Sequence, residues 1–204
     1  MTRIKICGVR SLAQARACVE KGVDSIGVNF VPSSPRRVDE ATARAIVRAV
    51  EGRALVVGVV ADLPVAAMIA LREAVGVGCL QLHGRESRED VSALLPHAYK
   101  AVRIASAEDV IEAEAMPGEF LMVDAKVEGN LGGTGRRFDW NLVTGLAARR
   151  KLVLAGGLTP ENVADAIRQV RPWCVDVASG VERSPGTKDM DKLQAFVAAV
   201  RSTG

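Results

Sequence analysis

Two side chains with acid–base chemistry each follow a short run that could form a strand in this sequence. Cys7 comes directly after residues 3–6, and Asp124 closes the wholly apolar run 120–123. A thiolate accepts a proton and a carboxylic acid donates one, so the pair would supply the general base and general acid that an isomerisation needs. Each residue also has a structural interpretation, as a buried core thiol or as a capping or ion-pairing carboxylate. The choice depends on whether the fold brings the two side chains together.

Other residues suited to ligand binding also follow apolar runs. Gly156-Gly157 and Ser179-Gly180 come after two successive runs, and glycine lets backbone N–H groups approach a phosphate, although tight turns are the alternative. Arg36 lies in a loop rich in proline and serine, and its planar guanidinium matches a carboxylate or a phosphate. His83 ends an apolar run in the same way, and its alternative is a hydrogen-bonded structural residue, the more common role of a lone histidine. The remaining polar residues at such ends are Asn29, Arg103 and Asp176.

A short apolar segment followed by an amphipathic one recurs eight times along the 204 residues. The predicted strands are 3–6, 25–30, 55–61, 79–82, 99–104, 120–123, 152–155 and 174–177. This alternation is typical of a parallel sheet, and eight units without a dividing linker predict one (β/α)8 barrel domain over residues 1–204. In such a barrel the carboxyl ends of all strands meet at one face, so the residues named above are expected to surround one site.

Helix signals support the same order of elements. Ser11 with Gln14 three residues later resembles a capping box, and Thr159-Pro160-Glu161 predicts the start of another helix. The last helix is expected to begin near Asp189 and to bury Leu193, Phe196, Val197 and Val200. A long loop over 126–139, with glycines between Gly129 and Gly135, is free to fold over a ligand or to be mobile.

Composition excludes several classes of protein. A net charge of +3 with 3% aromatic residues argues against nucleic-acid binding. The four cysteines have no metal-binding spacing and are interpreted as free thiols in a reducing compartment, so no metal or cofactor is expected. No apolar run reaches the ~18 residues of a membrane span, and we expect a cytoplasmic protein. An open doubly wound sheet is the rival fold, but the turn Cys7-Gly8-Val9-Arg10-Ser11 lacks the dinucleotide fingerprint.

Six motifs in order resemble the phosphoribosylanthranilate isomerase family of tryptophan biosynthesis, over the whole length of the chain. They are Lys5-Ile6-Cys7-Gly8; Pro32-x-Ser34-Pro35-Arg36; Gln81-Leu82-His83-Gly84; Asp124 with Gly132-Gly133-Thr134-Gly135 and Phe138-Asp139-Trp140; Ala155-Gly156-Gly157-Leu158 with Pro160-Glu161-Asn162-Val163; and Val175-Asp176-Val177-x-Ser179-Gly180-Val181-Glu182. The resemblance implies an Amadori rearrangement of N-(5′-phosphoribosyl)anthranilate to 1-(2-carboxyphenylamino)-1-deoxyribulose 5-phosphate.

The resemblance also implies roles for individual residues. Asp124 matches the general acid that opens the ribose ring, and Cys7 matches the general base that removes the C2′ proton. Arg36 matches the residue that holds the anthranilate carboxylate. The phosphate-binding turns match Gly156, Gly157, Ser179 and Gly180, and the rim positions near the substrate match His83 and Asp176. Independently of the resemblance, a base at Cys7 must be a thiolate when it acts, so its pKa is expected to be lowered by neighbours or by the bound cation. Lys5, on the same side of the strand, is the nearest candidate.

The sequence departs from the family's usual wording at Asn29, Arg37 and Ala178, which concern packing of the anthranilate ring and hydrogen bonding of the phosphate. Two other classes of function stay open at this point. One is a related phosphosugar barrel, such as an indole-glycerol-phosphate synthase or the histidine-pathway isomerase. The other is a barrel that binds a phosphosugar without catalysis. A monomer and a homodimer are both compatible with the helix faces.

Overall fold

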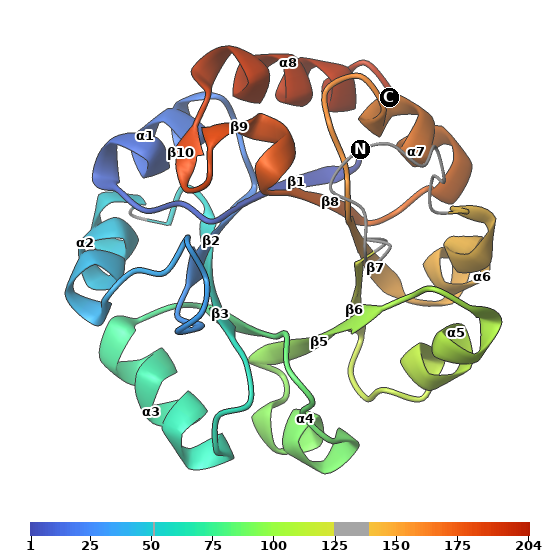
Figure 1. Cartoon of the computed structure of the whole chain (residues 1–204), viewed down its shortest axis with the longest axis horizontal. Coiled ribbons are helices and arrows are strands. Elements are labelled where there is room, and N and C mark those ends of the chain that lie inside the picture. The colour runs from blue at the N-terminus through green and yellow to red at the C-terminus, as the bar shows by residue number, and fades with distance from the viewer. Residues whose placement is uncertain (51, 125–138) are drawn as a thin grey trace.

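Eight parallel strands close into a barrel in chain order, which confirms the predicted fold (Figure 1). The structure is a computed structural model that describes residues 1–50, 52–124 and 139–204. The strands are β1 (Arg3–Cys7), β2 (Ser25–Asn29), β3 (Leu55–Val60), β4 (Cys79–Leu82), β5 (Ala98–Arg103), β6 (Phe120–Asp124), β7 (Lys151–Ala155) and β8 (Cys174–Val177). Each predicted strand is present, and its ends differ from the prediction by at most one residue.

Helices form a ring outside the barrel (Figure 1). They are α1 (Leu12–Glu20), α2 (Glu40–Val50), α3 (Val65–Val75), α4 (Arg88–Leu94), α5 (Ala107–Glu114), α6 (Asn141–Arg149), α7 (Val163–Val170) and α8 (Met190–Arg201). The main apolar core includes residues of the strands and of these helices, and a smaller cluster around Tyr99, Met122 and Val153 fills the barrel interior. As predicted, α8 buries Leu193, Phe196, Val197 and Val200. None of the helices in the described part of the chain has the length and apolar character of a membrane span.

The expected helix starts are confirmed for α1 and corrected for α7. The Ser11 hydroxyl accepts a hydrogen bond from the Gln14 backbone N–H at 3.3 Å, although the Gln14 side chain accepts from Arg10 and not from Ser11. The start predicted at Thr159-Pro160-Glu161 is wrong, because α7 begins only at Val163. Asn162 explains the delay, since its side-chain oxygen accepts from Thr159 N–H at 2.8 Å and its amide donates to the Gly157 carbonyl at 2.9 Å. These bonds hold residues 157–162 as a turn.

Strand alternation arranges the inward side chains in layers. Residues two apart on a strand point to the same side, so Lys5 and Cys7 share the interior face of β1. Gln81 of β4 and His83, the first residue after β4, are related in the same way. The middle layer contains four polar side chains that are 2–6% exposed: Lys5, Gln81, Tyr99 and Asp176. It separates a cavity at the carboxyl ends of the strands, which Gln81 and Asp176 line, from a cavity of about 250 Å³ at the amino ends, which Lys5 and Tyr99 line.

The chain after β8 forms a small unit that the sequence did not predict. A single 3-10 turn, η1 (Ser179–Val181), leads into the antiparallel pair β9 (Glu182–Ser184) and β10 (Thr187–Lys188). Figure 1 places this pair beside the first turns of α1 and α8. The glycine-rich loop expected at Gly129–Gly135, with its motif residues up to Phe138, lies outside the described residues.

Candidate active site

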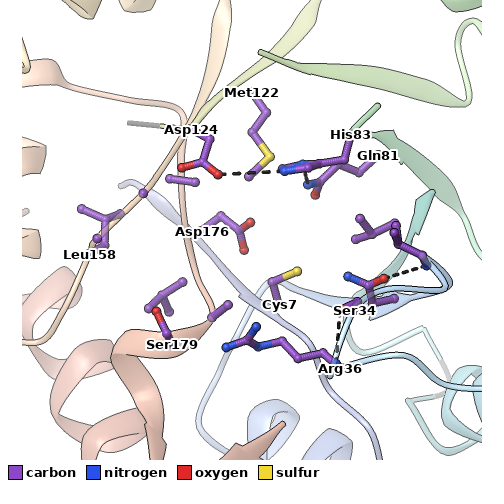
Figure 2. A pocket seen from close by; sticks show the side chains of 18 residues that line it. Cys7, Ser34, Arg36, Gln81, His83, Met122, Asp124, Leu158, Asp176 and Ser179 are labelled. Atoms are coloured by element: carbon purple, nitrogen blue, oxygen red, sulfur yellow. Dashed lines mark hydrogen bonds and ion pairs between the residues drawn. The ribbon is translucent and has the colours of Figure 1, made fainter. Parts of the chain in front are cut away.

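The predicted site residues surround one cavity of about 340 Å³ at the carboxyl ends of the strands. Figure 2 shows their side chains around the same space, contributed by strand ends and by the loops after them. The predicted residues that line the cavity are Cys7, Asn29, Arg36, His83, Asp124, Gly156, Gly157, Asp176, Ala178 and Ser179. Arg37 and Arg103 are exposed instead, and with Gly180 they are not among the lining residues of this cavity in the described part of the chain.

Cys7 ends β1 with its thiol bordering the cavity. Burial raises the pKa of this thiol above its ordinary value of 9.0, and the nearby positive charge of Lys5 opposes that rise without cancelling it. Lys5 therefore lowers the pKa of Cys7 as expected, but by less than burial raises it. The raised pKa favours the thiol over the thiolate at neutral pH.

Lys5 lies one layer below Cys7 and is 2% exposed. Its Nζ donates to Asp176 Oδ2 at 2.9 Å and to Gln81 Oε1 at 2.8 Å. Burial lowers the pKa of Lys5, but attraction to Asp176 and then to Cys7 outweighs it and leaves the pKa well above its ordinary value. Lys5 is thus a fixed ammonium beneath the thiol. The other carboxylate oxygen, Asp176 Oδ1, is buried without a hydrogen-bond partner among the described residues, which leaves it able to accept from a ligand.

His83 and Asp124 face each other across the cavity wall (Figure 2). His83 Nε2 lies 3.9 Å from Asp124 Oδ2, and the side chains keep 28% and 19% of their surface exposed. Burial lowers the pKa of His83, and attraction to Asp124 restores only part of the loss. His83 is therefore neutral at neutral pH and does not stabilise an ionised Asp124 as an imidazolium would.

Arg36 is held in place by the pair of strands that follows β8. Its Nε donates to Glu182 Oε1 at 2.9 Å and its Nη2 to Glu182 Oε2 at 2.6 Å. Lys188 donates to the same carboxylate at 3.0 Å, to the Cys7 carbonyl at 2.6 Å and to the Ala178 carbonyl at 3.1 Å. One edge of the Arg36 fork is thus occupied by Glu182, while the guanidinium still lines the cavity. Through its bond to the Cys7 carbonyl, Lys188 also fixes the end of β1 beside the thiol.

The glycine turns differ in what they contribute. Gly156 and Gly157 have φ values of 92° and 65°, a region that favours glycine, and a Cβ at Gly157 would meet open space. At Gly180 a Cβ would collide with the Leu158 backbone carbonyl, so this glycine allows the loop after β8 to pack against the loop after β7. Ser179 lines the cavity next to that contact. The two turns therefore form one continuous wall.

Three polar residues of the site were not assigned a role from the sequence: Gln81, Glu182 and Lys188. Gln81 stands in an apolar strand two residues before His83, so the alternation of that strand would have placed it inside the barrel below the histidine. Glu182 and Lys188 follow the last strand, where no periodicity distinguishes a buried ion pair from a solvated loop. Across residues 1–50, 52–124 and 139–204, no cluster of three or more His, Cys, Asp or Glu side chains is arranged to hold a metal ion.

Comparison with known proteins identifies the family. The family model "PRAI: N-(5'phosphoribosyl)anthranilate (PRA) isomerase" matches residues 4–199. An N-(5'-phosphoribosyl)anthranilate isomerase of Myxococcus xanthus is 45% identical over 208 residues, covering 98% of this chain and 96% of that relative. The chain belongs to the phosphoribosylanthranilate isomerase family.

Solved structures of phosphoribosylanthranilate isomerases share the whole fold. One from Thermotoga maritima has a TM-score of 0.90 at 36% identity, covering 99% of this chain and 100% of its own. Another, in complex with reduced 1-(o-carboxyphenylamino)-1-deoxyribulose 5-phosphate, has a TM-score of 0.87 at 33% identity, with 99% and 100% covered. The family and barrel implied by the sequence motifs are thereby confirmed, whereas the roles of individual residues stay predictions.

Proposed function

We propose that this protein catalyses the Amadori rearrangement of N-(5′-phosphoribosyl)anthranilate to 1-(2-carboxyphenylamino)-1-deoxyribulose 5-phosphate in tryptophan biosynthesis. Membership of the isomerase family supports the overall reaction. The observation that supports the proposed chemistry is the convergence of Cys7, Asp124 and Arg36 on one cavity bounded by two glycine turns. The reaction is a net isomerisation, in which the ring C–O bond opens, protons move within one molecule and nothing is oxidised or reduced overall, so the proposal needs no cofactor.

Asp124 acts first, as the general acid. Its carboxyl proton passes to the ribose ring oxygen while the bond from that oxygen to C1′ breaks. The nitrogen lone pair forms the C=N bond, which gives a cationic Schiff base and an Asp124 carboxylate. Neutral His83, 3.9 Å away, lies close enough to respond to that new negative charge through its N–H.

Cys7 acts second, as the general base. Burial keeps it a thiol before substrate binds, and the cationic Schiff base adds the positive charge that favours the thiolate. The thiolate removes the C2′ proton, and the electrons of that bond neutralise the iminium nitrogen to give an enolamine. Transfer of the enol proton and protonation of C1′ complete the ketone product, which has the same atoms as the substrate.

The remaining cavity residues bind the substrate. We assign the anthranilate carboxylate to Arg36. Glu182 accepts hydrogen bonds from Nε and Nη2 of this guanidinium, and the other edge is proposed to meet the substrate. The phosphate is assigned to the wall formed by Gly156, Gly157, Ser179 and Gly180, and the sugar hydroxyls to His83 and Asp176. Asp176 Oδ1 suits that role, because it is buried and has no hydrogen-bond partner within the described residues.

The cellular setting follows from the same proposal. A biosynthetic isomerase with reduced thiols belongs in the cytoplasm, and its partner is a small phosphosugar rather than a nucleic acid or a membrane. A dimeric phosphoribosylanthranilate isomerase is described for Thermotoga maritima, from which monomers were generated. A monomer and a homodimer are the two oligomeric states proposed for this chain, and light scattering in solution distinguishes them.

The proposal is tested by following the loss of phosphoribosylanthranilate fluorescence in a coupled assay. Cys7→Ser and Asp124→Asn should each lower kcat by about two or more orders of magnitude, the usual contribution of a positioned base or acid. Cys79→Ser, at the opposite end of the barrel, and Asp165→Asn, exposed on α7, are matched controls that should retain activity. Near-wild-type turnover in both site variants would refute the roles assigned here. A wild-type protein that binds the substrate without consuming it would indicate a binding protein.

A further inference from the structure

A buried chain of hydrogen bonds below the cavity ends on His83. Gln81 is 2% exposed, and its Oε1 accepts from Lys5 Nζ at 2.8 Å and from Tyr99 Oη at 3.1 Å. The other end of the same amide meets His83 Nδ1, with Gln81 Nε2 at 3.0 Å (Figure 2). The direction of each bond in this chain can be worked out from the donors alone.

The orientation of the Gln81 amide is set by Lys5. An ammonium group donates hydrogen bonds and has no lone pair with which to accept one, so the atom of Gln81 that faces Lys5 must be the oxygen. Burial raises the pKa of Tyr99 well above its ordinary value, which keeps its phenol protonated and able to donate to the same oxygen. The NH2 group of Gln81 is therefore directed to His83.

That orientation decides where His83 carries its proton. The amide NH2 group only donates, so His83 Nδ1 must accept and must hold its lone pair rather than a hydrogen. A neutral imidazole with an unprotonated Nδ1 carries its hydrogen on Nε2. This is the nitrogen that faces Asp124 Oδ2 at 3.9 Å.

We propose that Gln81 is a positioning residue that fixes His83 as the Nε2–H tautomer, with this N–H directed to Asp124 and the substrate side of the cavity. The benefit for catalysis rests on the proposed function: the N–H stabilises the carboxylate that Asp124 becomes after it has given up its proton. The tautomer itself does not depend on that function and is measurable without substrate.

The charged and titratable groups that act on His83 come from several strands. Asp124 favours the protonated imidazole, as Asp176 does more weakly, whereas Lys100 and Lys5 oppose it. The amide adds a geometric restriction, since protonation of Nδ1 would place two donors against each other. Gln81 therefore disfavours both the other tautomer and the imidazolium.

The decisive measurement is ¹⁵N NMR of the imidazole nitrogens. The chain has two histidines, His83 and the exposed His97, which serves as an internal reference. In wild-type protein we expect His83 Nδ1 to show the shift of an unprotonated nitrogen and Nε2 that of a protonated one. A protonated Nδ1 or a mixture of tautomers would overturn the proposal without any variant being made.

Gln81→Glu provides the complementary test. Its carboxylate still accepts from Lys5 and Tyr99, but the oxygen that replaces Nε2 can only accept, so His83 should become protonated at Nδ1. With the hydrogen moved from Nε2 to Nδ1, the N–H no longer faces Asp124, and kcat should fall by about tenfold or more. Tyr99→Phe is the matched control, because Lys5 still orients the amide and the His83 shifts should stay as in wild type. An unchanged His83 spectrum in folded Gln81→Glu would contradict the proposal.

The two proposals fail separately in this design. Wild-type protein without isomerase activity would refute the proposed function and leave the tautomer to be decided by NMR. An active wild-type enzyme whose Gln81→Glu variant has the predicted change in His83 shifts but full kcat would refute the catalytic benefit. The fixed tautomer would still be established.

Discussion

Lys5 is the residue through which one buried charge serves several neighbours. Its ammonium holds Asp176, orients Gln81 and lies close enough to Cys7 to oppose the rise in the thiol pKa. The thiol, the carboxylate and the amide thus depend on one side chain that the solvent does not reach. Substitution of Lys5 is expected to change the ionisation of its neighbours more than it changes the fold.

Lys5→Met should raise the pKa of Cys7 further, because the substitution removes the largest influence that lowers it and leaves burial unopposed. A base with a higher pKa is deprotonated only at higher pH, so the increase of kcat/KM with pH should occur at higher pH than in wild type. The pH dependence of alkylation, taken as the difference between proteins with and without Cys7→Ser, reports the thiol directly. Lys21→Met, with its exposed hydrogen bond to Gln194, is the control. An unchanged or lower pKa of Cys7 in Lys5→Met would refute the role assigned to Lys5.

At the scale of elements, β9 and β10 hold residues of the candidate active site in place. Glu182 and Lys188 connect this pair of strands to Arg36, to the end of β1 and to the end of β8. These two strands are short, yet they fix the Arg36 guanidinium that is proposed to bind the anthranilate carboxylate. Loss of these contacts should affect binding more than chemistry.

Glu182→Gln is predicted to raise KM and lower kcat/KM by about tenfold, with a smaller effect on kcat, since Arg36 loses its charged partner and its fixed orientation. Steady-state kinetics of the isomerase reaction measure this difference. Glu73→Gln, exposed on α3, should behave as wild type. A fall in kcat at unchanged KM would show that Glu182 does not act through substrate binding.

The same carboxylate predicts a dependence of stability on pH. Burial raises the pKa of Glu182, but hydrogen bonds from Arg36 and Lys188 outweigh it and leave the pKa below its ordinary value of 4.5. A lowered folded-state pKa contributes stability that is fully present above the unfolded-state pKa and is lost as pH falls through the folded-state pKa. The difference in unfolding free energy between wild type and Glu182→Gln, from urea titrations, should therefore shrink as pH falls below about 4.5. A constant difference across that range would contradict this assignment.

Elements with strong periodicity could be predicted from the sequence, and short or polar ones could not. The strands and α8 follow from runs of apolar residues at spacings of two or of three and four. The pair β9 and β10, with strands of three and two residues, is too short for any such pattern. The predicted start of α7 is wrong because Thr159-Pro160 signals a helix locally, while the hydrogen bonds of Asn162 hold a turn there.

For the site, the sequence placed Cys7, His83, Asp124 and Asp176 correctly at one face, since closure of a parallel barrel brings strand ends together. It did not reveal that Glu182 occupies one edge of Arg36, because that pair joins residues from opposite ends of the chain. The rise in the pKa of Cys7 was also missed. The result depends on the balance between burial and the distance to Lys5, and neither is visible in a sequence.

At the scale of the whole molecule, stability comes from the apolar layer between the barrel and its helices. Phe196 on α8 is fully buried there, and Phe196→Ala should cost about 3–5 kcal/mol of unfolding free energy. The exposed Gln194→Ala on the same helix should cost about 0.5 kcal/mol or less. Urea titration of both variants measures the contrast, and kcat of the folded fraction should not change. Equal losses would show that α8 is not anchored through Phe196.

The polar middle layer has one more consequence, for the traffic of small molecules. Lys5, Gln81, Tyr99 and Asp176 cross the barrel as a hydrogen-bonded partition, with one cavity on each side. Along the described strands, this polar layer closes the inner end of the cavity at the carboxyl ends. A ligand there therefore leaves by the mouth through which it entered. Substrate and product therefore share one mouth, and added viscosity should slow both the arrival of one and the departure of the other.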